Sequence, residues 1–321
     1  MAWLTGYGYR QKVPLKRVDG AVTDYQMLLT VNKGAGDSSG AVIYLKNHAL
    51  SWGSTVPNDL RFTRADEVTE LPYWIEFSDA NTAKVWGKYN SIETTDTYFY
   101  VYYGKSGDTT TSNGDNTFIF FDDFPGSTLD IAKWDTSGGG SVSVSDGLCT
   151  IIGGDRLILS KTNIFNNNTA ARARMQTNRW DTTAGMQQFG SQVTADWYNY
   201  VQMNYCHIYS SHRRHLDQAV AATETLLAAA TGDWAANTYY INEVIRAATH
   251  TRWTVNDVLK VELGTTNYPT ADGILYHRAY NSGDTMTVDW TLVRKWADQE
   301  PTWGTWGTEE TPPRSFGYII G

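Results

Sequence analysis

The sequence predicts an all-β protein built from two β-sandwich modules. At 321 residues the chain is longer than one typical domain, so two separate cores are expected. Trp, Tyr and Gly number 13, 20 and 28, whereas charged residues make up only 19%, a composition typical of strands and turns. Short β-branched and aromatic runs recur between Gly, Asn, Asp and Ser clusters, which favours sandwiches over helical folds.

The first module is expected over residues 1–104. Its strand-like runs read QKVPLKR, DYQMLLTV, AVIYLKN, DLRFT, LPYWIEF, TAKVWGKY and TYFYVYYG. Residues 105–117, KSGDTTTSNGDNT, contain no large apolar side chain. This composition predicts a linker between the modules.

The second module is expected over residues 118–298, where a further series of strand-like runs shows alternation of apolar and polar residues. Only residues 217–230 have a helical pattern, and we interpret them as an insertion or loop helix. Residues 299–321 are rich in Gly, Pro and Trp and would not fold alone. We expect this tail to pack against the body of the protein or a neighbouring subunit.

Charge and hydropathy exclude several classes of partner. The formal net charge of −8 and the pI of about 5.2 provide no basic field for phosphate backbones, so nucleic acid is not expected as a partner. No signal peptide is visible at the N-terminus, and no stretch is apolar and long enough to predict membrane insertion.

The sequence has two cysteines, Cys149 and Cys206. Their apolar and aromatic surroundings favour two buried free thiols over one disulfide, and both alternatives stay open.

Two strand patterns predict a ligand-binding face. Residues 197–206 alternate between two faces of a strand. The first face carries Trp197, Asn199, Val201, Met203 and Tyr205. The second face combines aromatic and amide side chains, namely Tyr198, Tyr200, Gln202 and Asn204. In residues 171–176, Arg172 and Arg174 point away from the apolar positions. If both polar faces belong to one sheet, they form a concave patch for a glycan or a neighbouring subunit. The predicted ligand-binding residues are Trp197, Tyr198, Tyr200, Gln202, Asn204, Arg172 and Arg174, and the alternative is an ordinary solvated sheet face.

Motifs in both halves resemble known families. In the first half they are Tyr9-Arg10, Asp59-Leu60-Arg61-Phe62-Thr63, Leu71-Pro72-Tyr73, Lys84-Val85-Trp86 and Tyr102-Tyr103-Gly104, and this half resembles the domain of unknown function DUF2341. The second half opens with Phe121-Asp122-Asp123-Phe124, Leu129-Asp130, Lys133-Trp134 and residues 142–147, and closes with residues 288–295. It resembles a concanavalin A-like (laminin G-like) lectin or glucanase sandwich, a jelly roll that hosts lectins, glycanases and structural modules alike.

The second resemblance implies a structural calcium ion between the first and last strands. On this sequence the role falls to Asp289, with backbone carbonyls and Asp122 or Asp123 completing an oxygen shell. The alternative is that these acids cap strand ends or pair with Arg294.

The residues do not show the catalytic pattern of the enzymes in that second family. Retaining glucanases carry two nearby carboxylates, typically in the pattern Glu-x-Asp-x-x-Glu on one strand, and this pattern is missing here. We therefore predict a non-enzymatic protein. The missing signal peptide, the missing catalytic pattern and the expected packing of the tail together favour the virion surface or the extracellular space, with a tail fibre, tail tip or capsid decoration as examples. The expected partners are a glycan or cell-surface polysaccharide, other virion or assembly subunits, and further copies in a homo-oligomer. The alternatives are a secreted or cell-surface polysaccharide-binding module and, third, a glycoside hydrolase.

Overall fold

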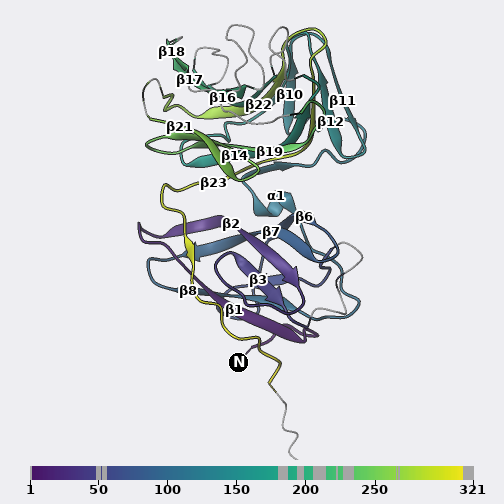
Figure 1. Cartoon of the computed structure of the whole chain (residues 1–321), viewed down its shortest axis with the longest axis vertical. Helices are drawn as coiled ribbons and strands as arrows, with labels where there is room; N and C mark the ends of the chain where they lie inside the picture. The colour runs from purple at the N-terminus through teal and green to yellow at the C-terminus, as the bar shows by residue number, and fades with distance from the viewer. Residues whose placement is uncertain are drawn as a thin grey trace, which may run out of the picture. The chain divides into compact units, whose positions relative to one another are not determined.

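The computed structural model describes residues 2–47, 52, 56–179, 187–193, 199–204, 215–221, 223–226, 235–264, 266 and 268–313. The chain divides into two compact units, shown in Figure 1. Unit 1 comprises Met1–Phe118 together with Gln299–Gly321, and unit 2 comprises Ile119–Asp298. Unit 1 is therefore assembled from two separate stretches of the sequence.

Unit 1 is made of two sheets. The five-stranded sheet has the order β24 (Thr302–Trp303), β1 (Tyr9–Lys16), β8 (Thr97–Tyr103), β4 (Arg61–Thr63) and β5 (Glu70–Leu71). The four-stranded sheet has the order β3 (Val42–Leu45), β2 (Val22–Lys33), β7 (Thr82–Ile92) and β6 (Tyr73–Ser78). Its β2 and β3 are parallel, and the other pairs are antiparallel.

The core of unit 1 lies between these two sheets. Val13 and Phe99 are paired across β1 and β8, and both are buried. Leu29 and Val85 are paired in the same way across β2 and β7. The ring of Tyr89 on β7 lies 4.6 Å from that of Phe99, so the buried rows of the two sheets meet in one sandwich core.

The tail runs along the edge of β1. β24 pairs with Leu15 and Lys16, and farther along the amide of Gly307 donates to the carbonyl of Lys12 at 2.8 Å. Arg10 and Glu310 then exchange two backbone hydrogen bonds. These bonds satisfy backbone groups that an edge strand would otherwise expose.

Residues 105–117, predicted to link the modules, are instead part of unit 1. The Arg61 guanidinium donates to the carbonyl of Thr109 at 2.9 Å, and the amide of Asn113 donates to the carbonyl of Tyr73 at 2.8 Å. The segment ends in the short helix α1 (Gly114–Thr117), which the Asn113 side chain caps. Backbone groups of this polar segment therefore form hydrogen bonds with β4 and β6. Composition alone predicts a linker because it does not show these bonds.

Arg10 on β1 holds together separate parts of unit 1, and we call its contacts the Arg10 clamp. Its guanidinium is 1% exposed and lies 4.4 Å from the ring centres of Trp3 and Tyr100. It donates to Glu310 at 2.7 Å and lies 3.3 Å from a carboxylate oxygen of Glu67. Ion pairs and cation–π contacts thus join the beginning of the chain, a turn and the tail.

Unit 2 also contains two sheets. The seven-stranded sheet has the order β10 (Trp134–Ser137), β13 (Arg156–Ser160), β22 (Gly273–Ala279), β15 (Gln187–Val193), β16 (Tyr200–Asn204), β17 (His215–Val220) and β18 (Thr223–Leu226). The second sheet has the order β11 (Ser141–Ser145), β12 (Leu148–Ile152), β23 (Thr285–Lys295), β14 (Thr169–Thr177), β19 (Tyr240–Arg246), β20 (Thr251–Val255) and β21 (Val258–Leu263), and β9 (Phe120–Asp122) also pairs with β23.

One apolar core fills the space between the sheets of unit 2. Ala171, Ala173 and Met175 on β14 face Val201 and Met203 on β16 within this core, as their alternation predicts. The buried thiol of Cys149 is free and belongs to the same core, where burial raises its pKa to about 12. The structure confirms the all-β class with two sandwiches.

The predicted helix in residues 217–230 is wrong for the described part of that range. β17 and β18 form an antiparallel hairpin, with Ala221 at a positive φ of 49° in its turn. β17 also pairs with β16, and Leu216 enters the core. Pairing and burial outweigh the helix propensity of an Ala-rich sequence, which is a weak preference. Within the described residues, no helix has the length and apolar character needed to cross a membrane.

Arg246 fixes one end of the unit 2 sandwich. Its fully buried guanidinium donates to the carbonyls of Phe165, Pro269 and Ala271 at 2.5 to 3.0 Å. It also donates to the side-chain oxygens of Ser191 and Asn167. Because burial disfavours the charged form, the pKa of Arg246 is lowered, although Tyr268 and Asp272 partly offset this effect.

Candidate functional site

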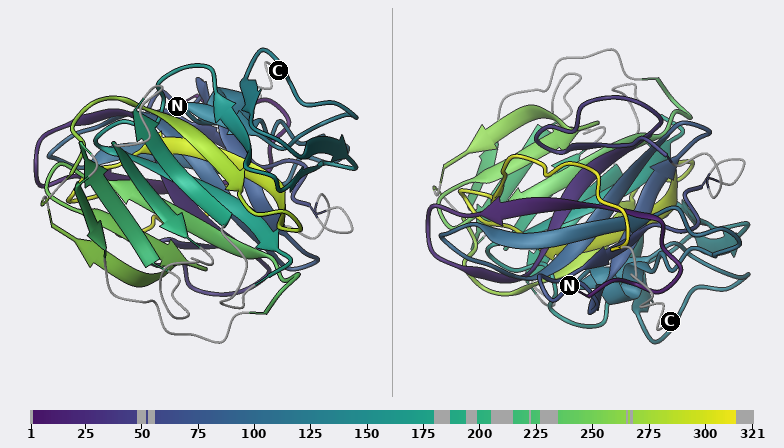
Figure 2. Two further views of the ribbon diagram at one scale, coloured as in Figure 1. Left: turned by 90° about the horizontal axis from the view of Figure 1, so that it is seen from above. Right: turned by 90° about the horizontal axis from the view of Figure 1, so that it is seen from below.

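The outer face of the seven-stranded sheet carries a row of polar side chains. On its three central strands, Phe189, Met203 and Leu275 point into the core. Alternation therefore places the intervening residues on the opposite face. We call six of these side chains the amide face: Gln188, Gln192, Tyr200, Gln202, Tyr276 and Arg278. Figure 2 (left) shows the strands of this sheet side by side, as teal and green arrows.

Hydrogen bonds connect the amide face across neighbouring strands. The hydroxyl of Tyr276 donates to Oε1 of Gln202, and Nη1 of Arg278 donates to Oε1 of Gln188 at 3.0 Å. Arg278 also donates through Nε to Asp155 at 2.7 Å. The guanidinium lies 4.5 Å from the ring centre of Tyr280. One end of the face is thus an Arg–Asp pair on an aromatic ring, and the remainder is uncharged.

Exposure differs along the amide face. Gln192 and Tyr276 are only 3% and 1% exposed. Tyr200 is half-buried, and the carboxylate side chain of Asp155 is 48% exposed. Accessible surface thus occurs at Tyr200 and at Asp155, at opposite ends of the row. The central Tyr276 is shielded, and so is Gln192, which lies opposite Tyr200.

Gly190 lets β15 and β16 approach closely beneath this row. A Cβ at this position would lie 2.2 Å from the carbonyl oxygen of Val201 and 2.6 Å from Cα of Gln202. Both are backbone atoms, so the strands would have to separate to accept any side chain. The position of Gln202 on the face therefore depends on a glycine at residue 190.

The structure places part of the predicted binding set on the amide face. Tyr200 and Gln202 lie there, and Asn204 occupies the next alternate position of β16, opposite Gln188. Trp197 and Tyr198 lie outside the described residues.

Arg172 and Arg174 do not join this face, which corrects the predicted shared patch. They lie on β14 of the other sheet, where Arg172 pairs with Asp257 at 2.8 Å and Arg174 pairs with Asp289. Arg174 also lies 4.3 Å from the ring centre of Tyr239. Alternation assigned these arginines to the correct side of their strand, but it could not show which sheet contains that strand.

The three predicted calcium ligands are not gathered around one cation. Asp289 contacts the Arg174 guanidinium, whereas Arg294, its predicted alternative partner, pairs with Glu243. The carboxylate of Asp122 accepts from the amide of Phe124 at 2.8 Å and from the indole of Trp134 at 2.6 Å. No group of three His, Cys, Asp or Glu suited to a metal occurs within the described ranges, which include Asp123. A calcium ion stays a prediction that these contacts do not support.

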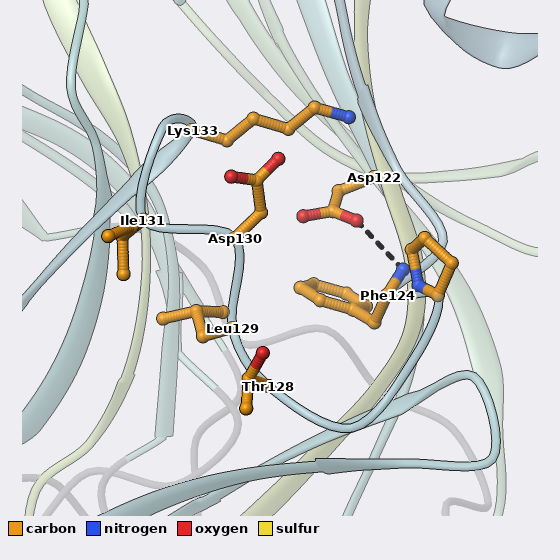
Figure 3. A pocket seen from close by; sticks show the side chains of 8 residues that line it. Asp122, Phe124, Thr128, Leu129, Asp130, Ile131 and Lys133 are labelled. Atoms are coloured by element: carbon orange, nitrogen blue, oxygen red, sulfur yellow. Dashed lines mark hydrogen bonds between the residues drawn. The ribbon is translucent and has the colours of Figure 1, made fainter.

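Asp122 lines a pocket of about 370 Å³ between β9 and β10, shown in Figure 3. Asp130 and Lys133 point toward it from the facing loop, and Ile131 at its rim is 79% exposed. Burial raises the pKa of Asp122, although its two N–H donors partly offset this effect. Asp130 accepts from the amide of Ala132, and Lys133 donates to the carbonyl of Phe121 at 2.8 Å. The polar groups of the pocket are thus engaged in holding its own loop.

Four residues of the amide face were not among the predicted site residues: Gln188, Gln192, Tyr276 and Arg278. A signal for two of them existed in QQFGSQV, where glutamines alternate with Phe189 and Ser191. The other two occur in ILYHRAY, which alternates in the same way. The pattern does not show how the strands pair. Only the order β22, β15, β16 makes these four residues neighbours of Gln202.

The family described as DUF2341, a domain of unknown function, matches residues 56–137. This match confirms the resemblance in part, because it covers less than half of the chain and extends from unit 1 into the first strands of unit 2. No curated protein matches the chain.

Solved structures similar to this chain include three named for glycan chemistry. A protein from a study of endo-acting O-glycanases that prominent human gut microbiota express to initiate mucin breakdown is 13% identical, with 56% of this chain and 99% of that chain covered and a TM-score of 0.45. A pseudo β-1,3-glucanase and immunostimulatory antigen of Mycobacterium tuberculosis is 12% identical, with 56% and 98% covered and a TM-score of 0.45. The endo-β-1,3-glucanase from Pyrococcus furiosus is 12% identical, with 56% and 94% covered and a TM-score of 0.41.

These names contradict the prediction that the protein is not an enzyme, and that prediction is corrected. It relied on a missing carboxylate motif, yet structures named as glycan-cleaving enzymes are among those similar to this chain. A pseudo-glucanase is among them as well. At 12 to 13% identity, the similarity assigns no activity, substrate or residue role to this chain.

Proposed function

We propose that unit 2 binds carbohydrate on its amide face. The observation that carries this proposal is the row of amides and phenols on three adjacent strands, with an Arg–Asp pair at one end. Amides and phenols both donate and accept hydrogen bonds, as sugar hydroxyls do. The rings of Tyr200 and Tyr280 add flat apolar surface on which a sugar ring stacks.

The accessible ends of the face are where a glycan makes its first contacts in this proposal. Tyr200 is half-buried at one end, and Asp155 with Arg278 lies at the other. Because Arg278 is already held by Asp155, Gln188 and the Tyr280 ring, its donors are oriented before any ligand arrives. Such pre-orientation lowers the entropy lost on binding.

The biological setting follows the sequence-based expectations. Assembly with other subunits at a virion surface, or secretion as a polysaccharide-binding module, each stays a prediction, as does a homo-oligomer. The acidic chain supports a glycan over nucleic acid as the partner.

The test is glycan binding by the full chain, first on a glycan array and then by calorimetry with the best ligand. Tyr200→Ala should weaken binding about tenfold because it removes a stacking ring. Tyr239→Ala is the matched control, since this tyrosine is also partly exposed but contacts Arg174 on the other sheet. Chromatography of the glycan after incubation shows in the same samples whether it is also cleaved. Absence of binding to every glycan, or equal binding by Tyr200→Ala, would contradict the proposal.

A further inference from the structure

Gln192 is the residue of the amide face with a buried side-chain acceptor that is not satisfied. It is 3% exposed, and its Oε1 has no hydrogen-bond partner. Buried polar side-chain atoms are normally paired, because an unpaired one loses its water without replacement. Gln188 and Gln202 on the same face both accept hydrogen bonds from protein groups. Gln192 therefore stands out as the group that a ligand would complete.

The neighbours of Gln192 match one side of a sugar ring. Tyr200 lies opposite Gln192 on β16, and Ile274 lies opposite it on β22. Side chains at directly opposed positions share a face and have Cβ atoms about 5 Å apart. A ring stacked on the half-buried Tyr200 thus carries its substituents over the Gln192 amide.

The chemistry of an amide selects a hydroxyl over a carboxylate. The Gln192 acceptor needs a donor, and if the amide is turned over, its NH₂ group needs an acceptor. A sugar hydroxyl provides both. A carboxylate or sulfate group provides only acceptors, so it would leave the Oε1 acceptor of Gln192 unpaired. The charge of Arg278 is already neutralised by Asp155, so this pair offers an anionic group no counter-ion.

We infer that the amide face takes an uncharged glycan, with a hydroxyl of one sugar residue bound by Gln192 and its ring stacked on Tyr200. This inference rests on the proposed function and narrows it to a ligand class. It also assigns Gln192 as a specificity-determining residue.

The deciding variant is Gln192→Met, which keeps the length of the side chain and removes its polar atoms. Two properties of the full chain are measured for wild type and variant. The first is the affinity for neutral glycans (a glucan, a mannan and a galactan) and for anionic glycans (polygalacturonate and a sulfated glycan). The second is the melting temperature. We expect the neutral class to bind, and Gln192→Met to weaken binding at least tenfold while the melting temperature is unchanged or higher. A residue with only a structural role would instead lower the melting temperature. Gln176→Met, on β14 of the other sheet, is the matched control and should leave binding unchanged.

The outcomes separate this inference from the proposed function. Binding of an anionic glycan with equal or higher affinity, or binding that Gln192→Met leaves intact, overturns the uncharged ligand while carbohydrate binding stands. Binding to no glycan of either class removes the proposed function itself. If Gln192→Met lowers the melting temperature, then Gln192→Leu repeats the test, and a second loss of stability overturns the role of Gln192 in the ligand contact.

Discussion

The two units bury an arginine in opposite ways. Arg10 in unit 1 has carboxylates and aromatic rings around it. Burial alone would lower its pKa, but its hydrogen bonds to Tyr102, Glu310 and Glu67 outweigh burial and raise the pKa above the ordinary value. Arg246 in unit 2 has only neutral oxygens as hydrogen-bond partners, and burial lowers its pKa. A buried guanidinium is thus stabilised either by counter-ions or by neutral hydrogen-bond acceptors, and the two arrangements should respond differently to mutation.

The largest expected effect is the loss of the Arg246 dipole set. Arg246→Met should destabilise unit 2 by about 4 kcal/mol, because the carbonyls of Phe165, Pro269 and Ala271 lose their donor while staying buried. Hydrogen exchange measured by mass spectrometry on the full chain localises the effect to strands β14, β15 and β19. Arg246→Lys should recover only part of the loss, since one ammonium cannot reach all of these oxygens. Full stability of Arg246→Lys would contradict the claim that several neutral acceptors must be bound at once to hold this buried cation.

Removal of the Arg10 cation should cost about 3 kcal/mol in unit 1. Arg10→Met leaves the carboxylate of Glu67, 16% exposed, without its cation. The expected readout is faster hydrogen exchange in β1 and β8, with the strands of unit 2 unchanged. Equal loss of protection in both units would show that the two arginines do not stabilise separate units.

The third expected effect is a loss of unit 2 stability in acid, caused by His277. His277 is fully buried among Phe189, Trp134 and Thr291, and burial lowers its pKa from 6.5 to about 3. Below pH 6.5 the unfolded chain therefore binds a proton that the folded unit does not, so stability is fully present above pH 6.5 and falls toward pH 3.

Between pH 7 and pH 5 this histidine should remove about 2 kcal/mol from the stability of unit 2. Denaturant unfolding followed by hydrogen exchange at both pH values measures the change. His277→Gln should lower stability at pH 7 but show a shallower pH dependence, because its side chain does not titrate. An identical pH slope in wild type and variant would refute this assignment.

The smallest expected effect belongs to the outer half of the Arg10 clamp. Glu310 is 36% exposed, so solvent screens its pairing with Arg10, and Glu310→Gln should cost less than about 1 kcal/mol. A double-mutant cycle with Arg10→Met measures the coupling energy directly. A coupling near 3 kcal/mol would mean that the tail, and not Glu67, supplies the main counter-ion.

Much of the fold follows from local pattern, whereas the grouping of the site does not. Alternation correctly sent Val201 and Met203 to the core and Gln202 to the outer face, because side-chain direction in a strand is a local property. It could not place Arg174 in a different sheet from Gln202, since sheet membership depends on partners distant in sequence. The same limit explains the Ala-rich hairpin at β17, where pairing with β16 decides the structure.

The return of the chain to unit 1 has a consequence for the order of folding during synthesis. Residues 299–313 follow all of unit 2 in the sequence, yet they supply β24 and the Glu310 partner of Arg10. A ribosome therefore releases every residue of unit 2 before the edge of β1 has its covering strand. Unit 2 is able to finish folding first, while unit 1 waits with an open sheet edge that is prone to pairing with other chains. Slow translation through residues 119–298 would lengthen that exposure.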